Sequence, residues 1–72
     1  MKNKFAERLL DLRKERGLTQ IELSRQTGIS NMAINRWERK ERTPTIEFII
    51  ILCDFFNCSS DYLIGRKDEL NA

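Results

Sequence analysis

The apolar and polar side chains follow a helical pattern from the start of the chain. Phe5, Leu9 and Leu12 recur at spacings of four and three residues, charged side chains separate them, and the pattern stops at Gly17. This spacing places the three apolar side chains on one face of a helix, which we expect over residues 4–16. No segment of the chain shows the alternating apolar and polar pattern that is typical of a half-buried strand.

Capping residues predict where the later helices begin. Thr19, followed three residues later by Glu22, has the pattern of a capping box, and Ser30, Thr45 and either Ser59 or Ser60 are N-cap residues of the preferred types. The expected helices cover residues 20–27, 31–39 and 46–56, and one or two further turns end at Gly65. The sequence therefore predicts an all-α fold, a compact cluster of five helices.

Two of these helices are short and are joined by Gly28, Ile29 and Ser30, which is the turn length of a helix-turn-helix unit. We expect residues 1–65 to form one domain and residues 66–72 to form a flexible C-terminal tail. The apolar residues expected in the core are Phe5, Leu9, Leu12, Leu18, Leu23, Ile29, Ile34, Trp37, Ile49, Leu52, Phe56 and Leu63.

The composition argues against several classes of protein. A chain of 72 residues with 40% hydrophobic side chains can form only one small core, which leaves no room for a deep substrate cavity, so we expect no enzyme. It has no histidine and only two cysteines, Cys53 and Cys58, which excludes a four-ligand zinc site, and we expect no metal and no cofactor. The longest apolar run, residues 48–53, is far shorter than a membrane span. We expect a cytoplasmic protein with reduced thiols and no contact with a membrane.

The charge is divided unevenly along the chain. Residues 1–44 have eleven basic and six acidic side chains, a net charge of +5, whereas residues 45–72 have two and five, a net charge of −3. The first part of the chain is therefore expected to bind an anionic partner.

Four short motifs resemble those of one family: Gly17-Leu18-Thr19-Gln20, Gly28-Ile29-Ser30, Trp37-Glu38 and Asp61-Tyr62-Leu63. Over residues 8–65 the chain strongly resembles the phage repressor and Xre family of bacterial helix-turn-helix DNA-binding proteins. Two residues depart from the family pattern, Lys40 in place of Gly and Ser24 in place of Ala. A left-handed backbone would cost Lys40 about 1 kcal/mol, so a different turn is expected there. The Ser24 hydroxyl is expected to bond back to a carbonyl of its own helix.

The resemblance implies a lambda repressor-like DNA-binding domain that inserts its third helix into the major groove of double-stranded DNA. Helical spacing independently places Ile34 and Trp37 on the buried side and a polar face without acids on the outside. By resemblance, the base-contacting residues are Asn31, Met32 and Arg36. Those that contact the backbone or flank the bases are Gln20, Ala33, Asn35, Arg39, Lys40 and Arg42. The resemblance also implies a salt bridge between Arg13 and Glu38.

These features indicate a sequence-specific transcriptional regulator, a repressor that acts by occupying its operator or the DNA-binding antitoxin of a two-component cassette. An alternative is a protein-interaction module that uses the same fold, for which the exposed apolar residues Ile21 and Ile51 are the best support. We also expect a homodimer, because Phe48, Ile51 and Phe55 extend the apolar arc of the helix at residues 46–56 beyond its core side.

Overall fold

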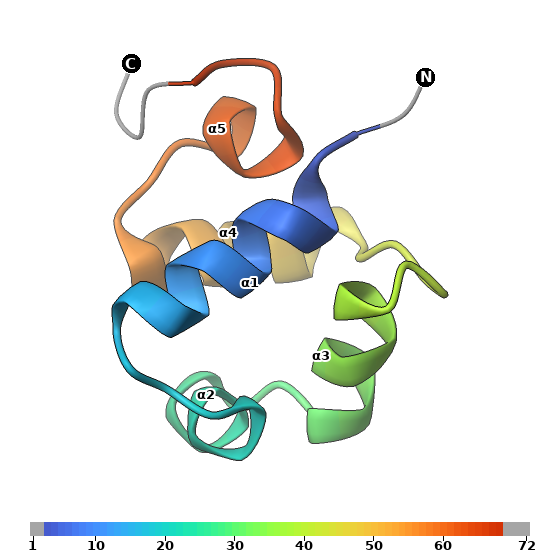
Figure 1. Ribbon diagram of the computed structural model, residues 1–72, viewed down its shortest axis with the longest axis vertical. Helices are drawn as coiled ribbons and strands as arrows, with labels where there is room; N and C mark the ends of the chain where they lie inside the picture. The colour runs from blue at the N-terminus through green and yellow to red at the C-terminus, as the bar shows by residue number, and fades with distance from the viewer. Residues whose placement is uncertain (1–2, 69–72) are drawn as a thin grey trace.

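The computed structural model describes residues 3–68, which form five helices and no strand (Figure 1). Their bounds are α1 (Phe5–Glu15), α2 (Gln20–Thr27), α3 (Asn31–Glu38), α4 (Ile46–Phe56) and α5 (Ser60–Ile64). The predicted all-α fold is confirmed. The first helix is one residue shorter at each end than expected, and the third ends one residue earlier.

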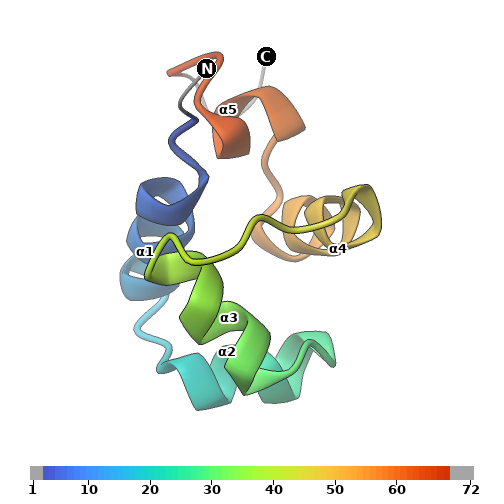
Figure 2. The same cartoon turned by 90° about the vertical axis from the view of Figure 1, so that its right-hand side faces the viewer.

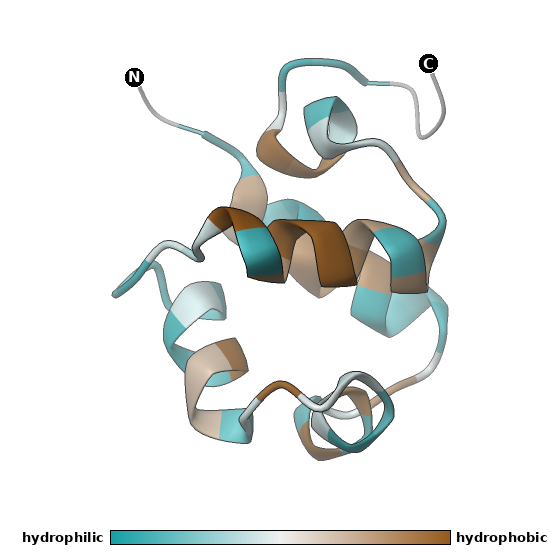
Figure 3. Cartoon of the chain, turned by 180° about the vertical axis from the view of Figure 1, so that it is seen from behind, coloured by the Kyte–Doolittle hydropathy of each residue, from teal (hydrophilic) through white to brown (hydrophobic). Residues whose placement is uncertain are grey.

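The helices form a compact cluster that measures 28 × 23 × 20 Å. In Figure 2, α1 and α4 face each other across the centre, with α5 above them and the α2–α3 pair below. Helix α1 packs against α3 and α5, α4 packs against α5 and α2, and α2 packs against α3. Helix α4 is the most hydrophobic element when the molecule is seen from behind (Figure 3), since only Glu47 and Asp54 interrupt its apolar sequence.

A single core lies between the helices. It contains every residue that the sequence predicts except Leu18, which is only partly buried and packs against the core from the α1–α2 loop. Two buried residues, Ala6 and Cys58, were not predicted. Burial of this kind is the main source of stability in a domain of this size.

Most of the predicted helix caps are present. Thr19 and Glu22 form the full capping box, in which the Thr19 hydroxyl accepts the Glu22 backbone N–H at 3.1 Å and the Glu22 carboxylate accepts the Thr19 N–H at 2.8 Å. Ser30 and Ser59 each accept one backbone N–H of the helix that follows. Thr45 occupies the predicted N-cap position of α4 with an extended backbone, but its exposed side chain makes no capping hydrogen bond.

The loop after α3 corrects one expectation. Lys40 adopts the left-handed conformation, with φ of 63°, instead of a different turn. In this conformation the Lys40 N–H donates to the Trp37 carbonyl at 3.1 Å and the Glu41 N–H donates to the Arg36 carbonyl at 2.9 Å. These two bonds satisfy carbonyls at the end of α3, which offsets the strain at Lys40.

The start of the expected C-terminal tail lies against the domain. The Arg66 N–H donates to the Asp61 carbonyl at 2.7 Å, and the Asp68 carboxylate pairs with Arg8 of α1 at 2.9 Å. Residues 69–72 of the expected tail are outside the described residues.

Candidate nucleic-acid interface

Helix α3 presents one polar face to solvent and one apolar face to the core. Ile34 and Trp37 are buried, as the helical spacing predicts. The three residues that the resemblance assigns to base contact lie together on the opposite face, where all three are exposed and Met32 is 62% exposed. These residues are Asn31, Met32 and Arg36. Ala33 and Asn35 are half-buried at the edges of this face.

The turn between α2 and α3 sets the direction of α3. Gly28 ends α2 in the left-handed conformation, with φ of 78°, and the Ile29 side chain that follows is buried in the core. The Ser24 hydroxyl donates to the Ile29 carbonyl in the turn, so the expected bond to a carbonyl of its own helix is not formed. Thr27 makes that type of bond instead, donating to the Leu23 carbonyl at 2.8 Å. Side-chain hydrogen bonds and a buried apolar residue therefore fix this turn.

The salt bridge between Arg13 and Glu38 is present and mostly buried. Arg13 Nε donates to Glu38 Oε2 at 2.7 Å and Arg13 Nη2 donates to Oε1 at 2.8 Å, which is the bidentate geometry of a strong pair. The two side chains are 12% and 6% exposed. The hydrogen bonds to Glu38 raise the pKa of Arg13, although burial opposes this. A third bond, from Arg13 Nη1 to the Leu18 carbonyl at 2.9 Å, attaches the same side chain to the α1–α2 loop.

Gln20 and Asn35 extend this network to the outer surface, which the sequence did not reveal. The Gln20 side-chain amide donates to Glu38 Oε1 at 2.9 Å, and its oxygen accepts a hydrogen bond from Asn35 Nδ2 at 3.2 Å. Residues from α1, α2 and α3 are thus joined in one chain of hydrogen bonds. Asn35 is oriented by this network and does not extend freely into solvent.

The basic residues after α3 are exposed, but two of them have acidic partners. Arg39 pairs with Glu41 at 3.0 Å and Lys40 pairs with Glu7 at 3.5 Å. Exposed pairs of this kind are weak, so a phosphate can replace the carboxylate. Within residues 3–68, Arg42 forms no ion pair.

The apolar arc of α4 divides into two parts. The rings of Phe48 and Phe55 are half-buried, since Phe48 packs on Trp37 with centroids 5.3 Å apart and the Arg16 guanidinium lies 4.9 Å from the Phe55 centroid. Ile51 is 38% exposed. The most exposed apolar side chains of α4 are on its other flank, where Ile46 is 66% and Ile50 is 54% exposed. The exposed apolar surface of α4 therefore consists mainly of isoleucine side chains, and the two aromatic rings contribute less to it.

Two further observations concern sites of other kinds. In the described part of the chain, no three histidine, cysteine or acidic residues are grouped as a metal site would need, and no helix is long and apolar enough to cross a membrane. Cys53 and Cys58 are free thiols, and burial raises the pKa of both, that of Cys53 to about 12.

Comparison with known proteins agrees with this geometry. The chain is 40% identical over 69 residues to repressor protein C2 of Salmonella phage P22, covering 94% of this chain and 32% of that protein. It is 35% identical to the HTH-type transcriptional regulator ImmR of Bacillus subtilis, covering 93% and 52% of the two chains. The crystal structure of a transcriptional regulator from Listeria innocua superposes with a TM-score of 0.83 at 30% identity, over 96% of this chain and 64% of that one.

The chain thus spans between about a third and two thirds of the length of these proteins. The helix-turn-helix family itself matches residues 9–63, which include α2, the fixed turn and α3 with its exposed polar face. This chain therefore belongs to the helix-turn-helix family.

Proposed function

We propose that this chain binds double-stranded DNA with sequence specificity and represses transcription by occupying an operator. The observation that carries the proposal is the outer face of α3, which presents the polar Asn31, the cationic Arg36 and the apolar Met32 and has no acid. The one acidic residue of α3, Glu38, is turned inward and paired with Arg13. Such a face suits the major groove, which admits a helix and offers hydrogen-bonding groups on the bases between two rows of phosphates.

Three exposed side chains supply the proposed base contacts. Arg36 suits guanine, where a guanidinium binds the O6 and N7 atoms together, and Asn31 suits the N6 and N7 atoms of adenine. Met32 suits the methyl group of thymine. The small side chain of Ala33 at the edge of this face permits a close approach to the bases.

The flanking residues supply contacts to the phosphate backbone. Gln20 lies at the first position of α2, where backbone N–H groups and the helix dipole favour an anion, and the second proton of its side-chain amide is available to a phosphate. Arg39, Lys40 and Arg42 add sequence-independent affinity that decreases as salt increases. Asn35 orients Gln20 from the edge of α3.

We also propose that the protein acts in the cytoplasm as a homodimer, without chemistry of its own. The exposed apolar surface of α4 supports this, and the proposed interface comprises Ile51, which is 38% exposed, and the half-buried Phe48 and Phe55. A dimer would place two copies of α3 about 34 Å apart, one turn of DNA. Sedimentation of the wild type and of Ile51→Asp tests this. A wild type that remains monomeric at high concentration, with and without DNA, would contradict it.

The test of function begins with selection of bound sequences from a random duplex library. Arg36→Ala and Arg42→Ala are then titrated against the selected duplex and a random duplex at several salt concentrations. We expect Arg36→Ala to lose about 1–3 kcal/mol on the selected duplex and to relax selectivity at one base pair.

We expect Arg42→Ala to weaken binding to both duplexes equally and to reduce the salt dependence. Lys14→Ala, an exposed residue of α1 outside the proposed interface, is the matched control and should change little. Equal losses of Arg36→Ala on both duplexes would refute the assignment of Arg36 to base reading. Failure to select any sequence would favour the protein-interaction module.

A further inference from the structure

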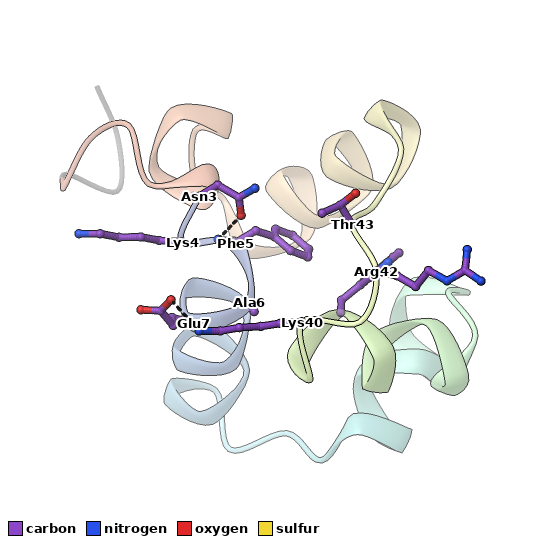
Figure 4. A pocket seen from close by; sticks show the side chains of 9 residues that line it. Asn3, Lys4, Phe5, Ala6, Glu7, Lys40, Arg42 and Thr43 are labelled. Atoms are coloured by element: carbon purple, nitrogen blue, oxygen red, sulfur yellow. Dashed lines mark hydrogen bonds and ion pairs between the residues drawn. The ribbon is translucent and has the colours of Figure 1, made fainter. Parts of the chain in front are cut away.

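A cleft lies between the first turn of α1 and the loop that joins α3 to α4 (Figure 4). Its volume is about 480 Å³, which is within the range of binding sites for small molecules. The aromatic rings of Phe5 and Trp37 meet edge to face at its base, with centroids 5.8 Å apart, and Ala6 lies beside them. The base of the cleft is therefore apolar.

The rim of the cleft is mostly cationic. Lys40 extends from the loop across to Glu7 of α1, where the two charged groups are 3.5 Å apart, and both side chains are exposed. Lys4 and Arg42 also belong to the lining and extend outward on either side of the cleft in Figure 4. The lining thus includes three cations and one carboxylate, and that carboxylate is already paired with Lys40.

The N-terminus of α1 adds a hydrogen-bond donor to this rim. The Asn3 side-chain oxygen accepts the Phe5 backbone N–H at 3.0 Å. Ala6 and Glu7 also line the cleft, and the backbone N–H of Glu7 has no hydrogen-bond partner within residues 3–68. An N–H group without a partner in the first turn of a helix, together with the helix dipole, favours a carboxylate or a phosphate.

We propose that this cleft binds a small amphipathic anion, a carboxylate with an aromatic or short aliphatic group, and that the bound anion weakens binding to DNA. The apolar group lies against the edges of Phe5 and Trp37, and the carboxylate contacts the first turn of α1 and displaces Glu7 from Lys40. The effect on DNA rests on the proposed function, because Lys40 and Arg42 are assigned there to phosphates. An anion in the cleft competes with the DNA backbone for these cations.

The fluorescence of Trp37 reports directly on the cleft, because the chain has no other tryptophan. The probes are benzoate and hexanoate, each compared at constant ionic strength with its neutral amide, benzamide or hexanamide. The carboxylates are expected to change the fluorescence in a saturable way, and the amides are not. An equal response to acid and amide, or a response to neither, would overturn the proposal.

Two charge-matched variants locate the site. Glu7→Gln removes the carboxylate that competes for Lys40 and is expected to tighten benzoate binding about three-fold. Glu15→Gln makes the same change in charge at the exposed C-terminal end of α1 and should leave benzoate binding unchanged. Equal effects of the two variants would mean that benzoate responds to net charge and not to the cleft.

The coupling to DNA is measured by titrating the selected duplex with and without saturating benzoate, with sodium chloride as the ionic control. We expect benzoate to lower the affinity for DNA several-fold more than chloride does. Saturable benzoate binding without this loss would refute the coupling. A protein that binds benzoate but selects no DNA sequence would refute the proposed function and leave the cleft as a ligand site.

Discussion

Replacement of Glu38 with alanine tests whether the buried ion pair holds α3 in place. The Glu38 side chain is 6% exposed and accepts hydrogen bonds from Arg13 and Gln20. In Glu38→Ala, the Arg13 guanidinium stays largely out of water with one remaining bond, to the Leu18 carbonyl. Removal of one partner of a fully buried pair costs about 3–5 kcal/mol, and the residual exposure here favours the lower end, about 3 kcal/mol.

A loss of this size is a large part of the stability of a small domain, which is about 4–11 kcal/mol for a chain of this length. It corresponds to a decrease in Tm of about 12–24 °C. The free energy of unfolding is measured by urea titration, with Trp37 fluorescence and far-UV circular dichroism as independent probes of a two-state transition.

The matched control is Glu41→Ala, which removes a carboxylate paired with Arg39 at 3.0 Å between two exposed side chains. We expect it to cost less than about 1 kcal/mol. The double variant Arg13→Ala/Glu38→Ala should lose less free energy of unfolding than the two single variants lose together. When both partners are removed, no unpaired charge stays buried. If Glu38→Ala cost no more than Glu41→Ala, the reasoning from burial would be refuted.

Three further predictions concern stability, each measured by denaturation. Thr19→Ala removes a capping box and should cost about 1 kcal/mol, whereas Thr45→Ala should cost only a few tenths because Thr45 makes no capping bond; equal costs would contradict this. Lys40→Gly should stabilise the protein by about 1 kcal/mol by relieving a positive φ, and an unchanged stability would show that the residue is not strained. Burial raises the pKa of Cys53 to about 12 from an ordinary value of 9.0, so the neutral thiol is favoured in the folded state. The contribution of this pKa difference to the free energy of unfolding is fully present below pH 9 and is lost as the pH rises toward 12. Cys53→Ala should reduce this loss of stability.

The features that the sequence predicts well are the local ones. Helical periodicity and the Thr19 capping box depend on residues within one or two turns of each other, so the helix bounds follow from short segments. The same spacing identifies Ile34 and Trp37 as the buried side of α3. Lys40 is the exception, because its left-handed conformation is stabilised by hydrogen bonds at the end of α3 that outweigh the local backbone preference.

The features that the sequence does not predict depend on contacts between helices. Gln20 and Asn35 are fifteen residues apart, and their hydrogen bond requires the packing of α2 on α3. The apolar arc of α4 is likewise visible in the sequence, but its two flanks are covered unequally. Phe48 is half-buried where its ring packs on Trp37, whereas Ile50 is 54% exposed. Residue spacing alone contains no information about which flank a neighbouring helix covers.

The side chains proposed to face the bases take no part in holding the fold together. Asn31, Met32 and Arg36 are exposed, and within residues 3–68 none of their side chains makes a hydrogen bond or an ion pair. Surface substitutions away from structural contacts usually change stability by less than about 0.5 kcal/mol. Mutation can therefore exchange these three residues for others, and so redirect the protein to a different operator, without first having to compensate for a weakened scaffold. Related regulators can diverge in the DNA that they read while they retain the same core.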